Sequence, residues 1–193
     1  MKHIFPNSCI TQFKRHGKVS LYIFSMIGAV LGLTAQASGA DKPYFCGDAN
    51  PVEAQSPVSV VQALYGVVSG KAGEPKNWQL LKELHAPTAS LTPVLHHGTV
   101  LDIQYLSVAD FVSLNKSIFA EINFFETEVE HKVIEVGHMA TVLSRYESRD
   151  EIGAAPYSTG INSFQLVNDG RRWCVVSVTW DSDKGGHVMP PLK

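Results

Sequence analysis

The sequence has little charge and few cysteines. Its 16 Lys and Arg residues stand against 18 Asp and Glu, so the net charge is -2 and no positive field is available to attract nucleic acid. No Cys-x-x-Cys pair occurs, and the adjacent His96 and His97 would point to opposite sides of an extended chain. We therefore expect no nucleic acid, no metal and no cofactor as a partner.

Residues 1–40 are typical of a cleavable export signal. Basic residues precede an apolar stretch over 19–33, which is shorter than the roughly 20 residues that span a bilayer. Small side chains follow, and signal peptidase is expected to cleave after Ala37 or Ala40 because its pockets admit only short side chains. An uncleaved membrane anchor is the alternative, but the apolar stretch ends in small residues rather than positive charge. The sequence thus predicts a periplasmic or secreted protein without membrane contact after cleavage.

Two cysteines would remain after cleavage. Removal of the leader takes Cys9 away and leaves Cys46 and Cys174, in a compartment where disulfides persist. One bridge would tie the start of the mature chain to a C-terminal strand. The alternative is two unpaired thiols, with Cys174 as a small buried hydrophobe. Both remain open, because pairing depends on a Cα separation that the sequence does not contain.

The mature chain is expected to hold one domain. A length of 193 residues with 45% hydrophobic side chains supports one core but not two ordinary domains. Residues 41–56 are polar and contain prolines and glycine, which predicts an N-terminal arm. The domain is expected over 57–183, and 184–193 is expected to be an irregular tail.

Three helices are predicted before any long strand. Ser56 is a fitting N-cap for the first, whose apolar residues recur at helical spacing until Gly70. The second is short and runs from Trp78 through His85, where a following Ala-Pro step disfavours helix. Ser107, with an aspartate three residues later, predicts the start of the third.

Long strands are predicted after the third helix, where the hydrophobic period changes. The stretch 89–105 is expected to be irregular or briefly extended, whereas beyond the third helix the period falls from about 3.6 to 2. Over 125–133 apolar residues alternate with Glu126, Glu128 and Glu130, which predicts a strand whose glutamate face is solvated. Return strands follow over 138–146, 160–167 and 172–181. The predicted class is α+β, with a curved antiparallel sheet that carries the three N-terminal helices on its concave face.

Two segments resemble proteins of the nuclear transport factor 2-like superfamily, in its SnoaL-like branch. They are ATVLSRYESR at 140–149 and GINSFQLVNDGRRW at 160–173, which runs on to Trp180 and Asp181. The resemblance implies a cone-shaped fold with a pocket between sheet and helices, and often a homodimer through the outer sheet face. It implies no single chemistry, since relatives include isomerases, dehydratases, cyclases, epoxide hydrolases and proteins that only bind.

The catalytic candidates follow from this resemblance. Isomerase-like relatives have a general base after the second helix, but 89–94 contains no carboxylate, so Asp102 is the nearest alternative. Dehydratase-like relatives use histidines with aspartate and tyrosine, which points to His131 and Tyr146. A lone aspartate before a strand is more often a turn or cap residue, and a lone strand histidine is more often a hydrogen-bonded core residue.

Further side chains are candidates for the pocket wall, because polar groups and indoles that project from strands can orient a ligand. Strand pairing and core packing are the alternative roles. The ligand-binding candidates are Trp78, His97, Tyr105, Ser144, Asn162, Gln165 and Trp180.

Three functional hypotheses result. The first is an exported protein that binds a small, partly apolar molecule without an assigned reaction. The second is a SnoaL-like lyase or isomerase that uses a histidine with a tyrosine or Asp102. The third is a dimeric interaction module.

Overall fold

A computed structural model describes residues 44–98 and 100–193. The predicted export signal, both cleavage positions and the first residues of the arm lie outside these ranges. No helix within them is long and apolar enough to cross a membrane.

The helices begin where the sequence supplies caps. In α1 (Pro57–Val68), Ser56 and Ser59 form a reciprocal capping box, and in α3 (Val108–Glu121) Ser107 and Asp110 do the same. The short helix α2 (Trp78–Glu83) ends earlier than predicted, because His85 already belongs to a strand. In the part of the chain that the structure describes, two single turns complete the helical elements, namely η1 (Val52–Gln55) inside the predicted arm and η2 (Asp183–Gly185) after the last strand.

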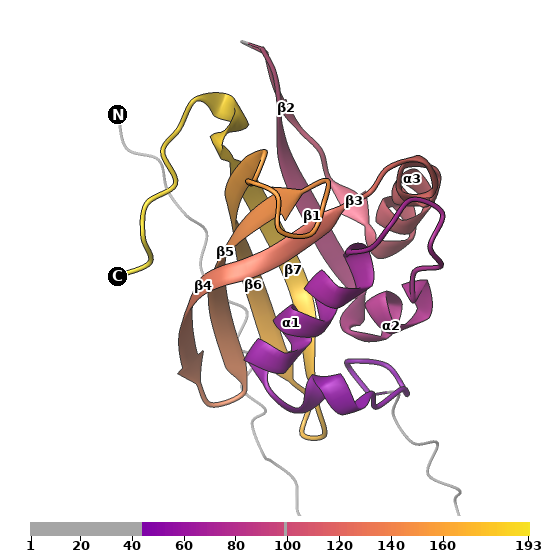
Figure 1. The fold of residues 1–193 in the computed structure, drawn as a ribbon. Coiled ribbons are helices and arrows are strands. Elements are labelled where there is room, and N and C mark those ends of the chain that lie inside the picture. The colour runs from indigo at the N-terminus through magenta and orange to yellow at the C-terminus, as the bar shows by residue number, and fades with distance from the viewer. Residues whose placement is uncertain (1–43, 99) are drawn as a thin grey trace, which may run out of the picture. The chain divides into compact units, whose positions relative to one another are not determined.

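The seven strands form one curved sheet in the order β2-β1-β7-β6-β5-β4, with β3 paired to β1. Figure 1 shows the three helices on one side of this sheet, so the predicted α+β class and helix placement are confirmed. The strands are β1 (His85–His97), β2 (Val100–Ile103), β3 (Leu106–Ser107), β4 (Phe125–Val136), β5 (Met139–Arg149), β6 (Ser158–Asn168) and β7 (Trp173–Ser182).

The structure corrects the prediction for 89–105. This stretch contributes most of the long strand β1, together with β2, and β1 pairs with β7 in parallel rather than antiparallel orientation. The prolines of β1 obscured the pattern, because proline cannot donate to a sheet ladder. Pro87 falls in the irregular stretch between His85 and Ser90, where the ladder with β7 is interrupted.

A β-bulge in β4 reverses which side chains face the helices. Glu128 is opposite Tyr146 and Glu130 is opposite Arg145, so Val129 is an extra residue in the strand. Before the bulge Glu126 and Glu128 point inward, whereas after it the odd-numbered residues do. The predicted solvated face for Glu126 and Glu128 was therefore wrong, and only Glu130 lies on the outer face.

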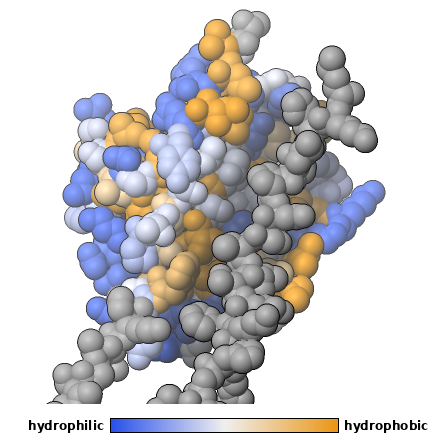
Figure 2. Space-filling view, turned by 180° about the vertical axis from the view of Figure 1, so that it is seen from behind, coloured by the Kyte–Doolittle hydropathy of each residue, from blue (hydrophilic) through white to orange (hydrophobic). Residues whose placement is uncertain are grey.

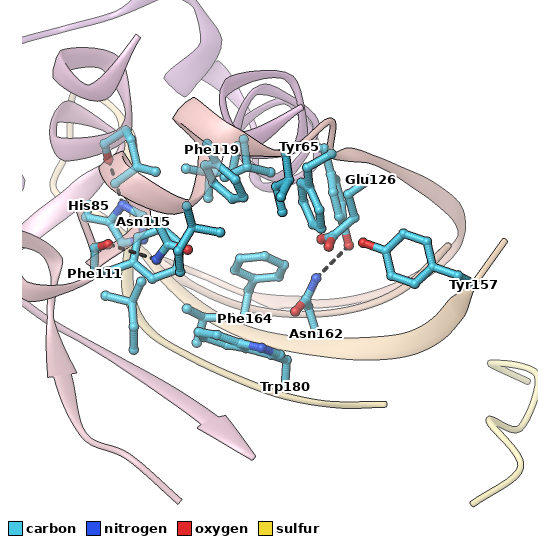
Figure 3. A pocket seen from close by; sticks show the side chains of 18 residues that line it. Tyr65, His85, Phe111, Asn115, Phe119, Glu126, Tyr157, Asn162, Phe164 and Trp180 are labelled. Atoms are coloured by element: carbon cyan, nitrogen blue, oxygen red, sulfur yellow. Dashed lines mark hydrogen bonds between the residues drawn. The ribbon is translucent and has the colours of Figure 1, made fainter. Parts of the chain in front are cut away.

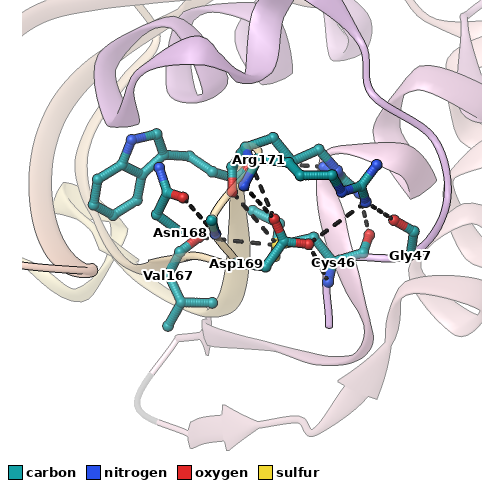
Figure 4. Close-up of a disulfide and its surroundings, with 10 residues drawn as sticks. Cys46, Gly47, Val167, Asn168, Asp169 and Arg171 are labelled. Carbon is teal, nitrogen blue, oxygen red and sulfur yellow. Dashed lines mark hydrogen bonds and ion pairs between the residues drawn. A yellow bond between two sulfur atoms is a disulfide. The ribbon is translucent and has the colours of Figure 1, made fainter. Parts of the chain in front are cut away.

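Cys46 and Cys174 form a disulfide with a Cα separation of 5.8 Å (Figure 4). It fastens the N-terminal segment to the hairpin between β6 and β7. Arg172, only 1% exposed, donates from its guanidinium to the carbonyl oxygen of Cys46. The arm is thus held by a covalent bond and by buried polar contacts.

Asp169 in the same hairpin collects three backbone donors. The amides of Cys46, Arg171 and Arg172 lie 3.2, 3.1 and 3.2 Å from its carboxylate oxygens. Burial alone would raise the pKa of Asp169, but these donors outweigh it and hold the pKa below its usual range. The hairpin therefore keeps a charged carboxylate against the arm at neutral pH.

The end of the β1–β2 hairpin projects from the body of the molecule and carries hydrophobic side chains at its surface (Figure 2). Val100, Leu101 and Ile103 on β2 are all more than half exposed. Their strand lies at one edge of the sheet, away from the helix-covered face.

Candidate functional site

A cavity of about 330 Å³ lies between the concave face of the sheet and the three helices (Figure 3). Its lining comes from all three helices and from the four strands β1, β4, β6 and β7, together with the segments between them. The lining residues are Leu64, Tyr65, Val68, Leu81, His85, Leu91, Phe111, Asn115, Ile118, Phe119, Ile122, Phe124, Glu126, Tyr157, Asn162, Phe164, Val178 and Trp180.

Aromatic rings make up much of the wall. Phe111 on α3 meets Trp180 on β7 edge to face, with ring centroids 6.2 Å apart. Phe119 stacks on Phe124 with ring centroids 5.1 Å apart. Phe164 lies between His85 and Glu126 in Figure 3. Such a wall favours an apolar or aromatic molecule.

One end of the cavity carries a carboxylate. Burial raises the pKa of Glu126 to about 7, although hydrogen bonds from Ser148 and Asn162 act in the opposite direction. Ser148 Oγ lies 3.3 Å from Glu126 Oε2, and the hydroxyl of Tyr157 points toward the same carboxylate in Figure 3. Glu126 is therefore divided between its charged and neutral forms at neutral pH.

A chain of hydrogen bonds leads from this end to the surface. Asn162 Nδ2 donates to the Tyr65 hydroxyl at 2.8 Å, which lies 2.7 Å from Ser144 Oγ. Ser144 donates to Glu128 Oε2 at 2.5 Å, because a carboxylate only accepts. The Tyr65 proton is thereby directed to Ser144 and away from the cavity.

The other end of the cavity carries a histidine. His85 is 3% exposed, and its Nδ1 lies 2.7 Å from the carbonyl oxygen of Leu81 in α2. Burial lowers the pKa of His85 to about 4, so the ring is neutral at neutral pH. The carbonyl accepts, which places the ring proton on Nδ1 and leaves Nε2 as a bare acceptor. Nε2 is buried and has no hydrogen-bond partner among the described residues.

The described residues contain no group of three or more His, Cys, Asp or Glu side chains that could hold a metal ion. A polar pair at opposite ends of an apolar chamber can instead orient an organic molecule.

Comparison with known proteins identifies the fold. The sequence matches no family model and no curated protein. A solved NTF2-like protein from Cytophaga hutchinsonii matches with a TM-score of 0.50 at 8% identity, over 65% of this chain and 93% of that one. The protein has an NTF2-like fold.

Two further NTF2-like proteins, both of unknown function, are also similar. The one from Silicibacter pomeroyi is 13% identical, with 65% of this chain and 91% of that one covered and a TM-score of 0.47. The one from Methylobacillus flagellatus is 14% identical, with 65% and 87% covered and a TM-score of 0.45. The match to the protein from Cytophaga hutchinsonii confirms the predicted NTF2-like fold, whereas the SnoaL-like branch stays a prediction.

Three of the predicted residues lie at or next to the cavity. Asn162 and Trp180 line it, as proposed from the sequence. Ser144 is fully buried one hydrogen bond behind Tyr65 and does not contribute to the lining.

The catalytic candidates do not line the cavity. His131 lies on the side of β4 that faces the helices, but its side chain is 38% exposed and pairs with Glu128 at 2.9 Å. Asp102 lies on β2 and accepts from Gln104 at 2.8 Å. Tyr146 is buried in the sheet opposite Gly160, where a side chain in place of that glycine would collide with its hydroxyl. Each of these side chains is packed or hydrogen bonded within its own part of the structure, and none contributes to the cavity lining.

The other ligand candidates also lie elsewhere. Trp78 stacks on Phe119 from outside the lining, at a centroid distance of 6.0 Å. His97 is exposed at the far end of β1, and Tyr105 is 78% exposed. Gln165 is exposed and accepts from Thr141 on the outer sheet face.

Sequence reasoning missed Glu126, His85 and Tyr65 as site residues. Glu126 was assigned to the wrong face because the alternation of apolar and polar residues along the strand does not reveal the bulge at Val129. Tyr65 was treated as a helix core residue, and His85 as the end of a helix. The available signal for His85 was its position at the junction of α2 with an extended segment.

We predict that Glu126→Gln stabilises the fold at alkaline pH. An acid whose pKa is raised to about 7 on folding costs stability once pH exceeds its ordinary value, and the cost is complete above about pH 7. The variant should gain roughly 2–4 kcal/mol in the free energy of unfolding near pH 8 and nothing near pH 4. Urea unfolding at both pH values measures the difference.

The exposed Glu135 on the same strand supplies the control, because Glu135→Gln should change stability little at either pH. Equal stability of Glu126→Gln and the parent protein near pH 8 would contradict the assigned environment of Glu126.

Proposed function

We propose that the protein binds a small, uncharged and largely apolar molecule in the cavity under α1, α2 and α3. The observation that carries the proposal is an aromatic chamber with an acceptor or carboxylate at each end. Its volume of about 330 Å³ lies within the range typical of ligand pockets. The NTF2-like fold supports small-molecule binding only at this general level.

Charge complementarity supports an uncharged ligand. None of the described residues that line the cavity is a lysine or arginine, whereas Glu126 brings a partial negative charge. An anionic ligand would be desolvated beside this carboxylate without a compensating cation. A neutral molecule avoids that cost.

Blocking the cavity from α3 tests the proposal. The probe is the bicyclic alcohol 2-naphthol, for which we expect a dissociation constant of about 0.1–1 mM by calorimetry. Ile118 is 47% exposed and lines the cavity, so Ile118→Trp should fold and weaken binding at least about tenfold by filling the space.

Leu114→Trp is the matched control. Leu114 lies one turn earlier on the same helix, is 50% exposed and does not line the cavity, so binding should be unchanged. Absence of binding to the parent protein, or equal binding by both variants, would sink the proposal.

A second candidate function is proton transfer to and from carbon, as in a lyase or isomerase. The observation that favours it is the position of Glu126, since a general base works best with a pKa near the working pH. In this proposal Glu126 takes the role first considered for Asp102 and His131. The Tyr157 hydroxyl, which points toward Glu126, would donate to a developing enolate oxygen.

Hydrogen exchange of the bicyclic ketone 2-tetralone tests this role. Glu126 would accept a proton from the carbon next to the carbonyl and return a deuteron in heavy water, which proton NMR detects. The rate should rise with pH through about 7 as Glu126 ionises, and Glu126→Gln should reduce it at least about a hundredfold. An exchange rate equal to that of buffer, or unaffected by the substitution, would eliminate the candidate.

We also propose export to the periplasm or the exterior. The leader pattern over 1–40 supports it, and so does the disulfide between Cys46 and Cys174, because such bonds persist in oxidising compartments. Mass spectrometry of the protein from a cell envelope fraction should find a chain that begins at Ser38 or Asp41 and has no free thiol. A chain that keeps its leader and both reduced thiols would refute export. The homodimer stays a prediction.

A further inference from the structure

We propose that His85 selects ligands that carry a hydroxyl or N–H group, through a hydrogen bond to its Nε2 atom. The inference rests on the proposed function and names the ligand class for that cavity. The class is neutral cyclic alcohols, phenols and N–H heterocycles, as opposed to ethers and carboxylates of the same size.

The backbone of α2 determines which ring nitrogen is free. His85 is the second residue after the helix, and its Nδ1 lies 2.7 Å from the carbonyl oxygen of Leu81. A carbonyl oxygen only accepts, so Nδ1 must carry the proton. The ring is thereby locked in the tautomer that presents a lone pair at Nε2.

Burial keeps the His85 ring neutral, so Nε2 remains a hydrogen-bond acceptor. His85 is 3% exposed, and the same burial lowers its pKa to about 4. Glu126, the charged group of the lining, lies at the opposite end of the cavity (Figure 3). The hydrogen bond to the Leu81 carbonyl favours the imidazolium, but burial outweighs it, and Nε2 stays an acceptor through neutral pH.

The protein itself does not satisfy this acceptor. Nε2 is buried without a hydrogen-bond partner in the part of the chain that the structure describes. The neighbouring amide of Asn115, which also lines the cavity, donates to the carbonyl oxygen of Phe111 at 2.8 Å. Buried acceptors in native proteins are almost always paired, so a donor from a bound molecule is the partner that this position lacks.

The chemistry of an unpaired acceptor produces strong discrimination. A hydroxyl or N–H of the ligand would restore the missing hydrogen bond, whereas an ether oxygen at the same place would bring its own lone pair against that of Nε2. An analogue without the donor would also leave Nε2 desolvated and unpaired. Specificity thus arises from rejection as well as attraction.

Three bicyclic probes of similar shape test the inference by calorimetry. We expect 2-naphthol to bind about 10–100-fold more tightly than naphthalene or 2-methoxynaphthalene, because both of these lack a hydroxyl. This order should hold even though both are more apolar than 2-naphthol. Equal affinities would overturn the role of His85 and leave the cavity proposal intact. Failure of all three probes to bind would instead overturn the proposed function.

Substitution of the ring assigns the discrimination to His85. In His85→Asn the amide can still donate to Leu81, as Nδ1 does, but no acceptor remains at the position of Nε2. The preference for 2-naphthol should fall to about twofold or less. The control is His97→Asn at the exposed end of the same strand, which should retain the full preference. Retention in His85→Asn with loss in Glu126→Gln would overturn the inference.

An NMR measurement on the parent protein gives an answer even where His85→Asn does not fold. The ¹⁵N resonance of His85 Nε2 should shift when 2-naphthol is added, because the lone pair becomes engaged, and should stay in place with 2-methoxynaphthalene. A resonance that stays in place with 2-naphthol, or shifts equally with both probes, would overturn the inference.

Discussion

The chemistry of the cavity depends on a single extra residue in β4. The bulge at Val129 shifts the pairing with β5 by one position. Even-numbered side chains therefore face the helices before the bulge, and odd-numbered side chains face them after it. On one side of the bulge Glu126 faces the chamber, and on the other Val133 packs against the hydrophobic core. A regular strand could not place both groups inward. The same strand thus contributes a carboxylate to the cavity and an apolar side chain to the hydrophobic core.

The two polar ends of the cavity differ in how they are held. Glu126 belongs to a network in which Asn162, Tyr65 and Ser144 are each hydrogen bonded, and that network continues to His131 at the surface. His85 is isolated, with one ring nitrogen used by the protein and the other unused. Both arrangements cost stability, since one buries a charge and the other leaves an acceptor unpaired. Proteins accept such costs mainly at functional sites.

Local signals in the sequence determined what could be predicted. Ser56 and Ser107 marked the starts of α1 and α3 because capping is a local interaction between residues three apart. Asn162 was one of several polar strand residues proposed for the pocket wall, and the structure places it in the cavity lining. Gln165, proposed with it, is exposed, because the sequence did not reveal which face of the strand points inward. The resemblance identified the NTF2-like fold from the sequences of β5 and β6.

Features that depend on distant contacts could not be predicted. The strand β1 forms because it lies beside β7, some 90 residues later in the chain, and its prolines mask it locally. The bulge at Val129 is defined by the pairing of β4 with β5, so the sequence of β4 alone does not predict it. His85 entered the site only because the strand begins two residues after α2 ends. In each case a tertiary contact overrode the local propensity.

The disulfide has a consequence for the order of events during synthesis. Cys46 is synthesised 128 residues before Cys174, so its partner does not exist until the chain has reached β7. The bond can therefore close only after most of the domain has been synthesised, and it then links the segment before α1 to the last strand in chain order.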